Sequence, residues 1–344
     1  MKMITLEKIR NKGVKNAELI YSNPLSCEED VRDFVMEGSA VVSFPEGHLR
    51  LENAIDPSNG QKANYVFWCP KTMPSDVAIE WDFKPLREPG LCMLFFSAAG
   101  RTGEDLFAPS LQPRTGEYPL YHHGDINAFH VSYFRRKEPD ERAFHTCNLR
   151  KSYGFHLVAQ GADPIPDAAD ASGFYHMTLI KFEDTVRFFV NDLEVFQFVD
   201  DGTTYGPQLL GGKVGFRQLA PMLAEYADLK VWSLVSDKDA AVKELCGQIS
   251  ALIRGRHGNI TLEECAQKLN YHPSYIWKVL KKQNTTFTAL ANKEKISLAK
   301  EYLDQSEYTI NEISERLHYS NPQNFIRFFN KYIGMTPGEY RRRV

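Results

Sequence analysis

The spacing of apolar positions changes once along this chain, close to residue 236. Upstream of that point apolar and polar residues alternate, as in Val77–Phe83 and Tyr175–Phe182, and this period of two is typical of half-buried β-strands. Leu91–Phe96 is a continuous apolar run, which predicts a strand buried on both faces. Similar short segments occur at His130–Phe134, Thr185–Val190, Val195–Val199, Val214–Phe216 and Ala227–Trp232.

Turn residues such as Asn191-Asp192 and Asp201-Gly202 separate these segments. Many short strands with such punctuation predict an antiparallel sandwich or barrel, and Lys181–Val199 predicts a three-stranded meander with tight turns. Two long loops are expected, at Gly100–Gly124 and Gly161–Gly173. Loops of that length in a compact domain often carry function.

Downstream of residue 236 the apolar period becomes that of an α-helix. One apolar stripe consists of Val242, Leu245, Ile249, Leu252 and Ile253, as expected for a helix with one buried face.

Two similar segments then follow, Thr261–Tyr271 and Thr309–Tyr319, with an offset of 48 residues. Each opens at a threonine with a glutamate three residues later, which predicts a capping box. Each then breaks at a turn before a second helix. This pattern is a repeated helix-turn-helix, a motif that places a helix in the major groove of DNA.

Apolar residues make up 43% and charged residues 25% of the 344 residues, which is usual for a soluble protein of two or three domains. The pattern divides the chain into a sandwich at 1–235, a linker and first helix at 236–258, and a helical DNA-binding region at 259–344. No apolar run is long enough to cross a membrane. The charged start, 1–16, is not a secretory signal, and six scattered cysteines fit free thiols. We therefore expect a cytoplasmic protein with no membrane partner.

Charge is distributed unevenly along the chain. Residues 241–344 hold 16 Lys and Arg against 10 Asp and Glu, whereas residues 1–240 hold 25 against 34. A basic C-terminal part on an acidic body is expected where only the C-terminal part meets a polyanion.

The C-terminal region resembles the AraC/XylS family of bacterial transcription regulators. Asn324–Arg341 follows that family's signature F-x-R-x-F-K-x-x-x-G-x-T-P-x-x-Y-R, except that Asn330 replaces the usual lysine. In the signature, Gly334 suits the end of the recognition helix and Pro337 suits the first position of the last helix. In the first unit, Asn284 stands where the family usually has glycine, and asparagine tolerates the left-handed conformation. The turn of the first unit is also one residue shorter than that of the second.

The resemblance implies that the chain reads double-stranded promoter DNA with two helices, and RNA polymerase is a further partner that it allows. Phe287–Leu303 is expected to link the two units as one helix. Residues such as Arg327 and Gln323 suit guanine and adenine edges, whereas basic residues such as Lys331 and Arg341 suit phosphates. The predicted DNA-contacting residues are Ser274, Trp277, Lys278, Lys281, Gln323, Asn324, Arg327, Lys331 and Arg341.

The upstream region resembles the YesU-like family, which implies a jelly-roll sandwich of the concanavalin A-like lectin and glucanase kind. The motifs are Ile79–Phe83, Gly124–Arg136 and Gly212–Gln218. The resemblance implies an acidic oligosaccharide from pectin-type breakdown as ligand. Arginine forks bind carboxylates, and aromatic rings stack on sugars. The predicted ligand-binding residues are Trp81, His130, Tyr133, Arg135, Arg136, Arg150, Lys151 and Arg217.

An enzyme is the alternative to a sensor. No strand carries the acidic spacing of a jelly-roll glucanase, although Glu80 and Asp82 share a face. A polysaccharide lyase needs only a base and groups that neutralise a uronate, and a candidate set is His130, Tyr133, Arg135, Arg150 and Gln218. The group His122, His123 and Asp125 is a weaker metal candidate, because adjacent strand residues point apart.

The sequence thus predicts a multidomain protein, an N-terminal all-β jelly-roll sandwich followed by a C-terminal all-α double helix-turn-helix. We interpret it as an AraC-type regulator of carbohydrate catabolism, with no catalytic residue, metal or cofactor assigned. A lyase or glycoside hydrolase fused to a DNA reader remains the alternative, and so does a sandwich that serves only as a dimerisation scaffold. A homodimer through the sandwich edges or the Val242–Ile253 stripe is left open.

Overall fold

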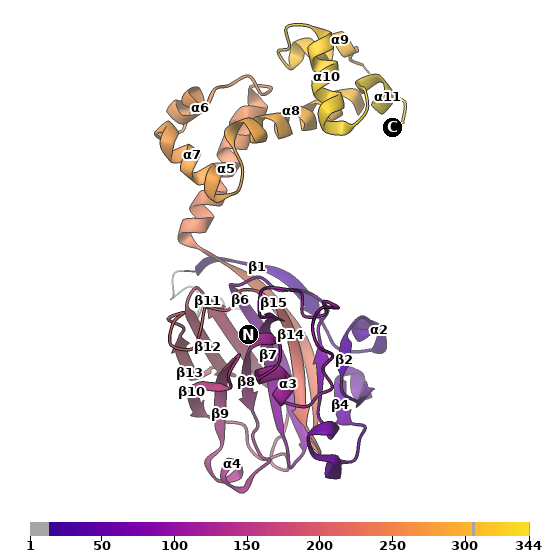
Figure 1. Cartoon of the computed structure of the whole chain (residues 1–344), viewed down its shortest axis with the longest axis vertical. Helices are drawn as coiled ribbons and strands as arrows, with labels where there is room; N and C mark the ends of the chain where they lie inside the picture. Colours follow the sequence, from indigo (N-terminus) through magenta and orange to yellow (C-terminus); the bar gives the residue numbers. More distant parts are fainter. Residues whose placement is uncertain (1–13, 305–306, 344) are drawn as a thin grey trace. The chain divides into compact units, whose positions relative to one another are not determined.

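The computed structural model describes residues 14–304 and 307–343. The predicted non-secretory start therefore lies almost wholly outside the described residues. The chain divides into two compact units, 1–236 and 237–344, which are described separately below (Figure 1). No helix in the described ranges is long and apolar enough to cross a membrane.

The first unit is a sandwich of two antiparallel sheets. One sheet has the strand order β13-β12-β11-β6-β15-β4-β3, with β1 also paired to β15, and the other has the order β10-β9-β8-β7-β14-β5-β2. The strands of the first sheet are β1 (Val14–Asn23), β3 (Ala40–Ser43), β4 (Leu49–Asn53), β6 (Val77–Arg87), β11 (Tyr175–Phe182), β12 (Thr185–Val190), β13 (Leu193–Val199) and β15 (Leu223–Ser236). Those of the second are β2 (Val35–Glu37), β5 (Tyr65–Trp68), β7 (Leu91–Gly100), β8 (Ile126–Tyr133), β9 (Thr146–Ser152), β10 (His156–Ala162) and β14 (Lys213–Leu219).

The core of the sandwich lies between the two sheets and is rich in aromatic rings. Trp81, Phe83, Tyr133, Phe216 and Tyr226 are all buried there, and burial of such rings is the main favourable term in folding. Short helices sit in the connections: α2 (Glu28–Val31), η1 (Pro45–Gly47), η2 (Pro57–Ala63), α3 (Pro119–His122) and α4 (Pro139–Phe144).

The predicted all-β sandwich is confirmed, and every strand segment predicted from the apolar pattern lies in a strand, except that β8 ends at Tyr133, one residue before the predicted Phe134. The predicted meander is β11-β12-β13, paired in sequence order. The predicted loop Gly100–Gly124 is irregular apart from α3. Strands β1 to β5, β9 and β10 were not predicted; β2 to β5 are only three to five residues long, too short for an apolar pattern to stand out.

The second unit is helical. Its elements are α5 (Asp237–Gly255), α6 (Leu262–Lys268), α7 (Pro273–Lys282), α8 (Phe287–Asp304), α9 (Ile310–Arg316), α10 (Pro322–Ile333) and α11 (Pro337–Arg341). The predicted capping boxes at Thr261 and Thr309 are both present. Asn270 and His318 occupy matching positions in the two turns, each with a φ of 57°. The second turn is one residue longer, as the sequence indicates.

The linking helix α8 belongs to both helix-turn-helix units. Phe287 and Leu290 in its first half pack into the core around α7, whereas Leu298 and Leu303 in its second half pack into the core around α10. Because one continuous helix contributes residues to both of these cores, it holds the two helix-turn-helix units at a fixed spacing.

The apolar stripe of α5 does not form a free surface. Leu245, Ile249 and Ile253 are buried against Ile276 and Leu280 of α7. The suggestion that this stripe mediates dimerisation is therefore wrong, because the helix-turn-helix core already covers it.

An ion pair on the outer side of the first sheet generates a pH-dependent contribution to stability. His176 Nδ1 lies 2.7 Å from Asp82 Oδ1, and its Nε2 lies 3.5 Å from Glu80 Oε1. Hydrogen bonds to Asp82 and then Glu80 raise the pKa of His176 to about 9. Since the folded state binds this proton more tightly, the contribution is complete below the unfolded pKa of about 6.5 and is lost as pH rises toward 9.

We therefore expect the midpoint of thermal unfolding to fall between about pH 6.5 and pH 9 more steeply for the native chain than for His176→Gln. Scanning calorimetry of both proteins across this range measures the difference. Equal slopes for the two proteins would contradict the assignment.

Candidate nucleic-acid interface and candidate ligand pocket

Helix α7 presents a mixed aromatic and basic face. Ile276, Val279 and Leu280 are buried in the core, so the helical period turns the other side of the helix to solvent. Trp277 is 52% exposed, and Lys281 Nζ lies 4.8 Å from the centre of its ring. All four residues predicted to contact DNA from this helix are exposed: Ser274, Trp277, Lys278 and Lys281.

Sequence reasoning missed two aromatic side chains next to this face. Tyr271 and Tyr275 are both exposed, and their rings stack with centres 5.3 Å apart. Their spacing of four residues across a helix start is the signal that could have identified the pair.

Helix α10 is built in the same way as α7. Phe325 and Phe329 are buried, and Asn321 caps the helix by accepting a hydrogen bond from the Asn324 amide. Gly334 ends the helix with a φ of 80°, as predicted. The predicted DNA-contacting residues on α10 are exposed: Gln323, Asn324, Arg327 and Lys331.

Arg341 was assigned to a phosphate contact, and the structure corrects this. Its guanidinium donates to the carbonyl of Leu303 at 3.3 Å and to that of Tyr308 at 2.6 Å. Arg341 is half-buried and ties the end of α8 to α11. The side chain therefore stabilises the helical unit instead of reaching outward.

Most of the predicted ligand-binding residues of the sandwich are buried. Trp81 and Tyr133 lie in the core between the sheets, where the Trp81 indole donates to the Tyr133 hydroxyl at 3.2 Å. The prediction that these rings stack on sugars is wrong, because neither ring reaches the surface.

Arg136 is also an internal residue. Its guanidinium is fully buried and lies 3.2 Å from Asp163 and 2.9 Å from Asp167. It also donates to the carbonyl of Ile165 at 2.7 Å. Its assignment to a ligand is corrected, because these partners satisfy it and hold the loop after β10.

Arg217 and His130 lie on the outer face of the second sheet, beneath the Gly100–Gly124 loop. Arg217 Nη1 donates to the carbonyl of Gly116 at 2.5 Å, and its guanidinium is packed 4.8 Å from the Tyr118 ring centre. His130 contacts the Tyr118 hydroxyl at 2.7 Å and Ser152 Oγ at 3.0 Å. Burial, followed by the charge of Arg150, holds the pKa of His130 well below its usual range. Because the loop covers both residues, their assignment to a ligand is also corrected.

Lys151, in strand β9, is anchored to the loop that follows β13. Its Nζ donates to both Asp200 oxygens at 2.8 Å and to the carbonyl of Gly206 at 3.0 Å. These three partners use all three of its N–H donors. Lys151 therefore shapes its surroundings and does not offer a free charge.

Arg135 and Arg150 are the two predicted ligand-binding residues that remain partly exposed. Arg135 is paired with Glu141 at 2.5 Å. Arg150 packs 3.9 Å from the Phe155 ring centre and forms no ion pair with any described residue. Their role toward a ligand stays a prediction.

The lyase set suggested by the sequence does not assemble. Tyr133 faces the core, and Gln218 is bonded to the hydroxyls of Tyr65 and Tyr226 inside it. His130 lies on the opposite face of the same strand. In the described ranges no group of three metal-ligating side chains gathers around His122 and His123.

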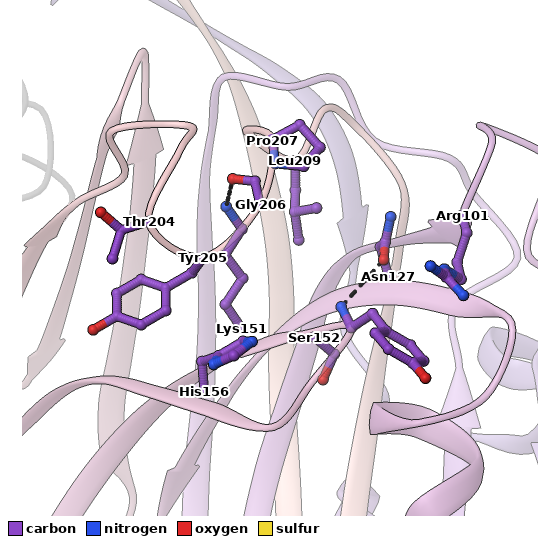
Figure 2. Close-up of a pocket in the computed structure, with 11 residues that line it drawn as sticks. Arg101, Asn127, Lys151, Ser152, His156, Thr204, Tyr205, Gly206, Pro207 and Leu209 are labelled. Atoms are coloured by element: carbon purple, nitrogen blue, oxygen red, sulfur yellow. Dashed lines mark hydrogen bonds between the residues drawn. The ribbon is translucent and has the colours of Figure 1, made fainter.

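A pocket of about 330 Å³ opens beside Lys151, and most of its residues were not predicted. Figure 2 shows Tyr205 and Arg101 on opposite sides of it. The lining is contributed by the start of the Gly100–Gly124 loop, by β8, by the end of β9 with its turn into the start of β10, and by the loop after β13. It consists of Arg101, Asn127, Lys151, Ser152, Tyr153, His156, Thr204, Tyr205, Gly206, Pro207 and Leu209. The turn-rich sequence around Tyr205 and the flagged Gly100–Gly124 loop were the signals available for it.

Comparisons with known proteins agree with this architecture. A family model described as a domain of unknown function (DUF1961) matches residues 18–231, and one described as a helix-turn-helix domain matches residues 265–343. The uncharacterized protein YesU of Bacillus subtilis is 54% identical over 221 residues, which cover 64% of this chain and 98% of that protein.

A solved structure from Bacillus subtilis, described as a protein of unknown function with a galectin-like fold, covers 65% of this chain and 99% of its own at 54% identity, with a TM-score of 0.62. The uncharacterized HTH-type transcriptional regulator YtdP of Bacillus subtilis is 32% identical over 120 residues, 34% of this chain and 16% of that protein. Both resemblances drawn from the sequence are confirmed.

The burial of Arg136 gives a direct test of its structural role. Arg136→Met leaves the buried Asp163 carboxylate without its partner, and loss of one member of a buried pair costs about 3–5 kcal/mol. Arg150→Met is the matched control, because Arg150 has no ion pair in the described structure and is partly exposed. Urea unfolding of the sandwich should show the large loss for Arg136→Met alone. A loss below about 1 kcal/mol would show that Arg136 is not an anchor.

Proposed function

The chain belongs to the DUF1961 family and carries an AraC-type helix-turn-helix domain, and we propose that it is a transcription regulator whose DNA affinity responds to an acidic oligosaccharide bound by the sandwich. The observation that carries the proposal is the pair of exposed faces on α7 and α10, built alike around one shared helix.

These faces carry charges that no described residue neutralises. Lys278, Lys281, Arg327 and Lys331 form no ion pair with a described residue, and all four are exposed. Cations left unpaired on a helix face are available to phosphates and base edges. The polar residues beside them, Gln323 and Asn324, suit adenine.

The spacing of the two faces also suits duplex DNA. Helix α8 has 18 residues, which correspond to roughly 27 Å at 1.5 Å per residue. Successive major-groove segments lie about 34 Å apart. A strut of this length supports placement of α7 and α10 in neighbouring segments of the major groove.

The effector part of the proposal depends on the sandwich. Its galectin-like relative shows the fold, and a fold alone does not identify a ligand. The ligand class is supported by the pocket beside Tyr205, whose lining includes Arg101, because arginine forks suit carboxylates.

Replacement of a base-reading residue and of a phosphate-binding residue should have different effects. Arg327→Ala should weaken binding to a selected operator by about 1–3 kcal/mol and relax specificity at one base pair. Lys331→Ala should weaken binding to all sequences alike and reduce the dependence on salt by about one phosphate contact. Fluorescence anisotropy on operator and scrambled duplexes separates the two effects. Equal losses on both duplexes for both variants would exclude the assignment of Arg327 to base readout.

A ligand regulates DNA binding only if it binds the DNA-competent and DNA-incompetent states with different affinity. We expect oligogalacturonate mixtures to change the operator Kd of the full chain about 5- to 150-fold, the usual range of such coupling. The same titration with neutral galactan fragments is the control. An unchanged Kd with every fragment that binds the protein would refute the sensor role and leave the DNA-binding role intact.

A further inference from the structure

The pocket beside Tyr205 has an unusual balance of charge for an acidic domain. Its lining includes three basic residues, Arg101, Lys151 and His156, and no aspartate or glutamate. Lys151 is paired with Asp200, so Arg101 is the lysine or arginine of the lining that has no ion pair with a described residue. An anionic ligand would therefore enter without meeting an unpaired carboxylate of the lining.

Two of the donor groups that line the pocket have no hydrogen-bond acceptor among the described residues. The guanidinium of Arg101 packs 4.1 Å from the ring centre of Tyr153 and forms no ion pair with any described residue. Asn127 accepts the Tyr153 amide at 3.2 Å through its Oδ1, while its NH2 group donates to no described residue. A planar guanidinium beside an amide donor suits a carboxylate, because the fork makes two parallel hydrogen bonds.

Aromatic rings form two sides of the pocket. Tyr153 is 42% exposed, and Tyr205 is partly exposed next to His156, with ring centres 5.2 Å apart. Such rings combine an apolar face with a polar edge. This combination suits a sugar ring, which has one apolar face and a rim of hydroxyl groups.

The wall that carries Tyr205 is held in place without a ligand. Asp201 accepts the amides of Thr203 and Thr204 at 2.8 Å and the Thr204 hydroxyl at 2.5 Å. Lys151 fixes the carbonyl of Gly206 from below, as Figure 2 shows. A preformed wall lowers the ordering cost of binding.

We infer that this pocket is a binding site for a small saccharide that bears a carboxylate, such as a uronic acid mono- or disaccharide, with Arg101 on the carboxylate and Tyr205 against the sugar ring. A volume of about 330 Å³ lies at the lower end of the range of roughly 300–1,000 Å³ for small-molecule sites, which favours a short fragment over a polymer. The inference names the ligand site within the proposed regulator and rests on that proposal for its biological meaning.

Isothermal titration of the full chain with digalacturonic acid, and with neutral galactobiose for comparison, tests this site. Arg101→Met should lower the affinity for digalacturonic acid about tenfold or more, because a charge-assisted pair is lost, and should leave galactobiose unchanged. Tyr205→Ala should weaken both sugars. Arg150→Met, a change of the same type on the other face of the sheet, should weaken neither. Thermal unfolding of each variant confirms that it is folded.

The inference is overturned if the native chain does not bind digalacturonic acid, if it binds galactobiose equally well, or if Arg150→Met abolishes binding while Arg101→Met does not. Operator binding measured on the same samples separates the two proposals. Sugar binding at the pocket that leaves the operator Kd unchanged keeps this site and refutes the sensor role. Loss of operator binding alone has no bearing on the pocket.

Discussion

The alternation of side chains along each strand decides which residues of the sandwich can meet a ligand. Successive residues of a strand point to opposite faces of its sheet, and the space between the two sheets is filled by aromatic rings. On β8, Tyr133 enters that core whereas His130 lies on the outer face. The two residues are three positions apart, so no rotamer brings them into one site. The residues of the sandwich that can contact a ligand therefore lie on its outer faces, at its edges and in the loops at its ends.

Basic residues of the sandwich serve mainly as anchors for those loops. Arg136 holds the segment around Ile165, Arg217 holds the Gly100–Gly124 loop through Gly116, and Lys151 holds the loop at Gly206. A buried cation is costly unless its donors are satisfied, and the backbone carbonyls and carboxylates of the loops satisfy them. A cluster of basic residues in an acidic domain therefore reflects loop attachment and not ligand recognition at most of these positions.

The parts of the molecule that follow from local sequence could be predicted. The strands with regular alternation, the two capping boxes, the left-handed turn at Asn284 and the stop at Gly334 all depend on residues close together in the chain. The pocket could not be predicted in this way, because Arg101 and Tyr205 come to line one pocket only after the chain has folded into two packed sheets. The parity of strand positions was visible in the sequence, however, and would have excluded Tyr133 from any site that contains His130.

The sandwich and the helical part of the chain are joined through strand β15 and helix α5. Strand β15 ends at Ser236 and α5 begins at Asp237, so the two elements follow each other directly in the chain. Strand β15 is hydrogen-bonded to β6 and β1, and α5 is packed against the recognition helix α7 through Ile249 and Ile253. In the proposed regulator, a ligand that changes the preferred position of β15 would act on α5, which contributes to the core beneath α7. A packed core has a few discrete arrangements and not a continuum, so in the proposed regulator a ligand effect carried along this connection would favour one arrangement of the DNA reader over another.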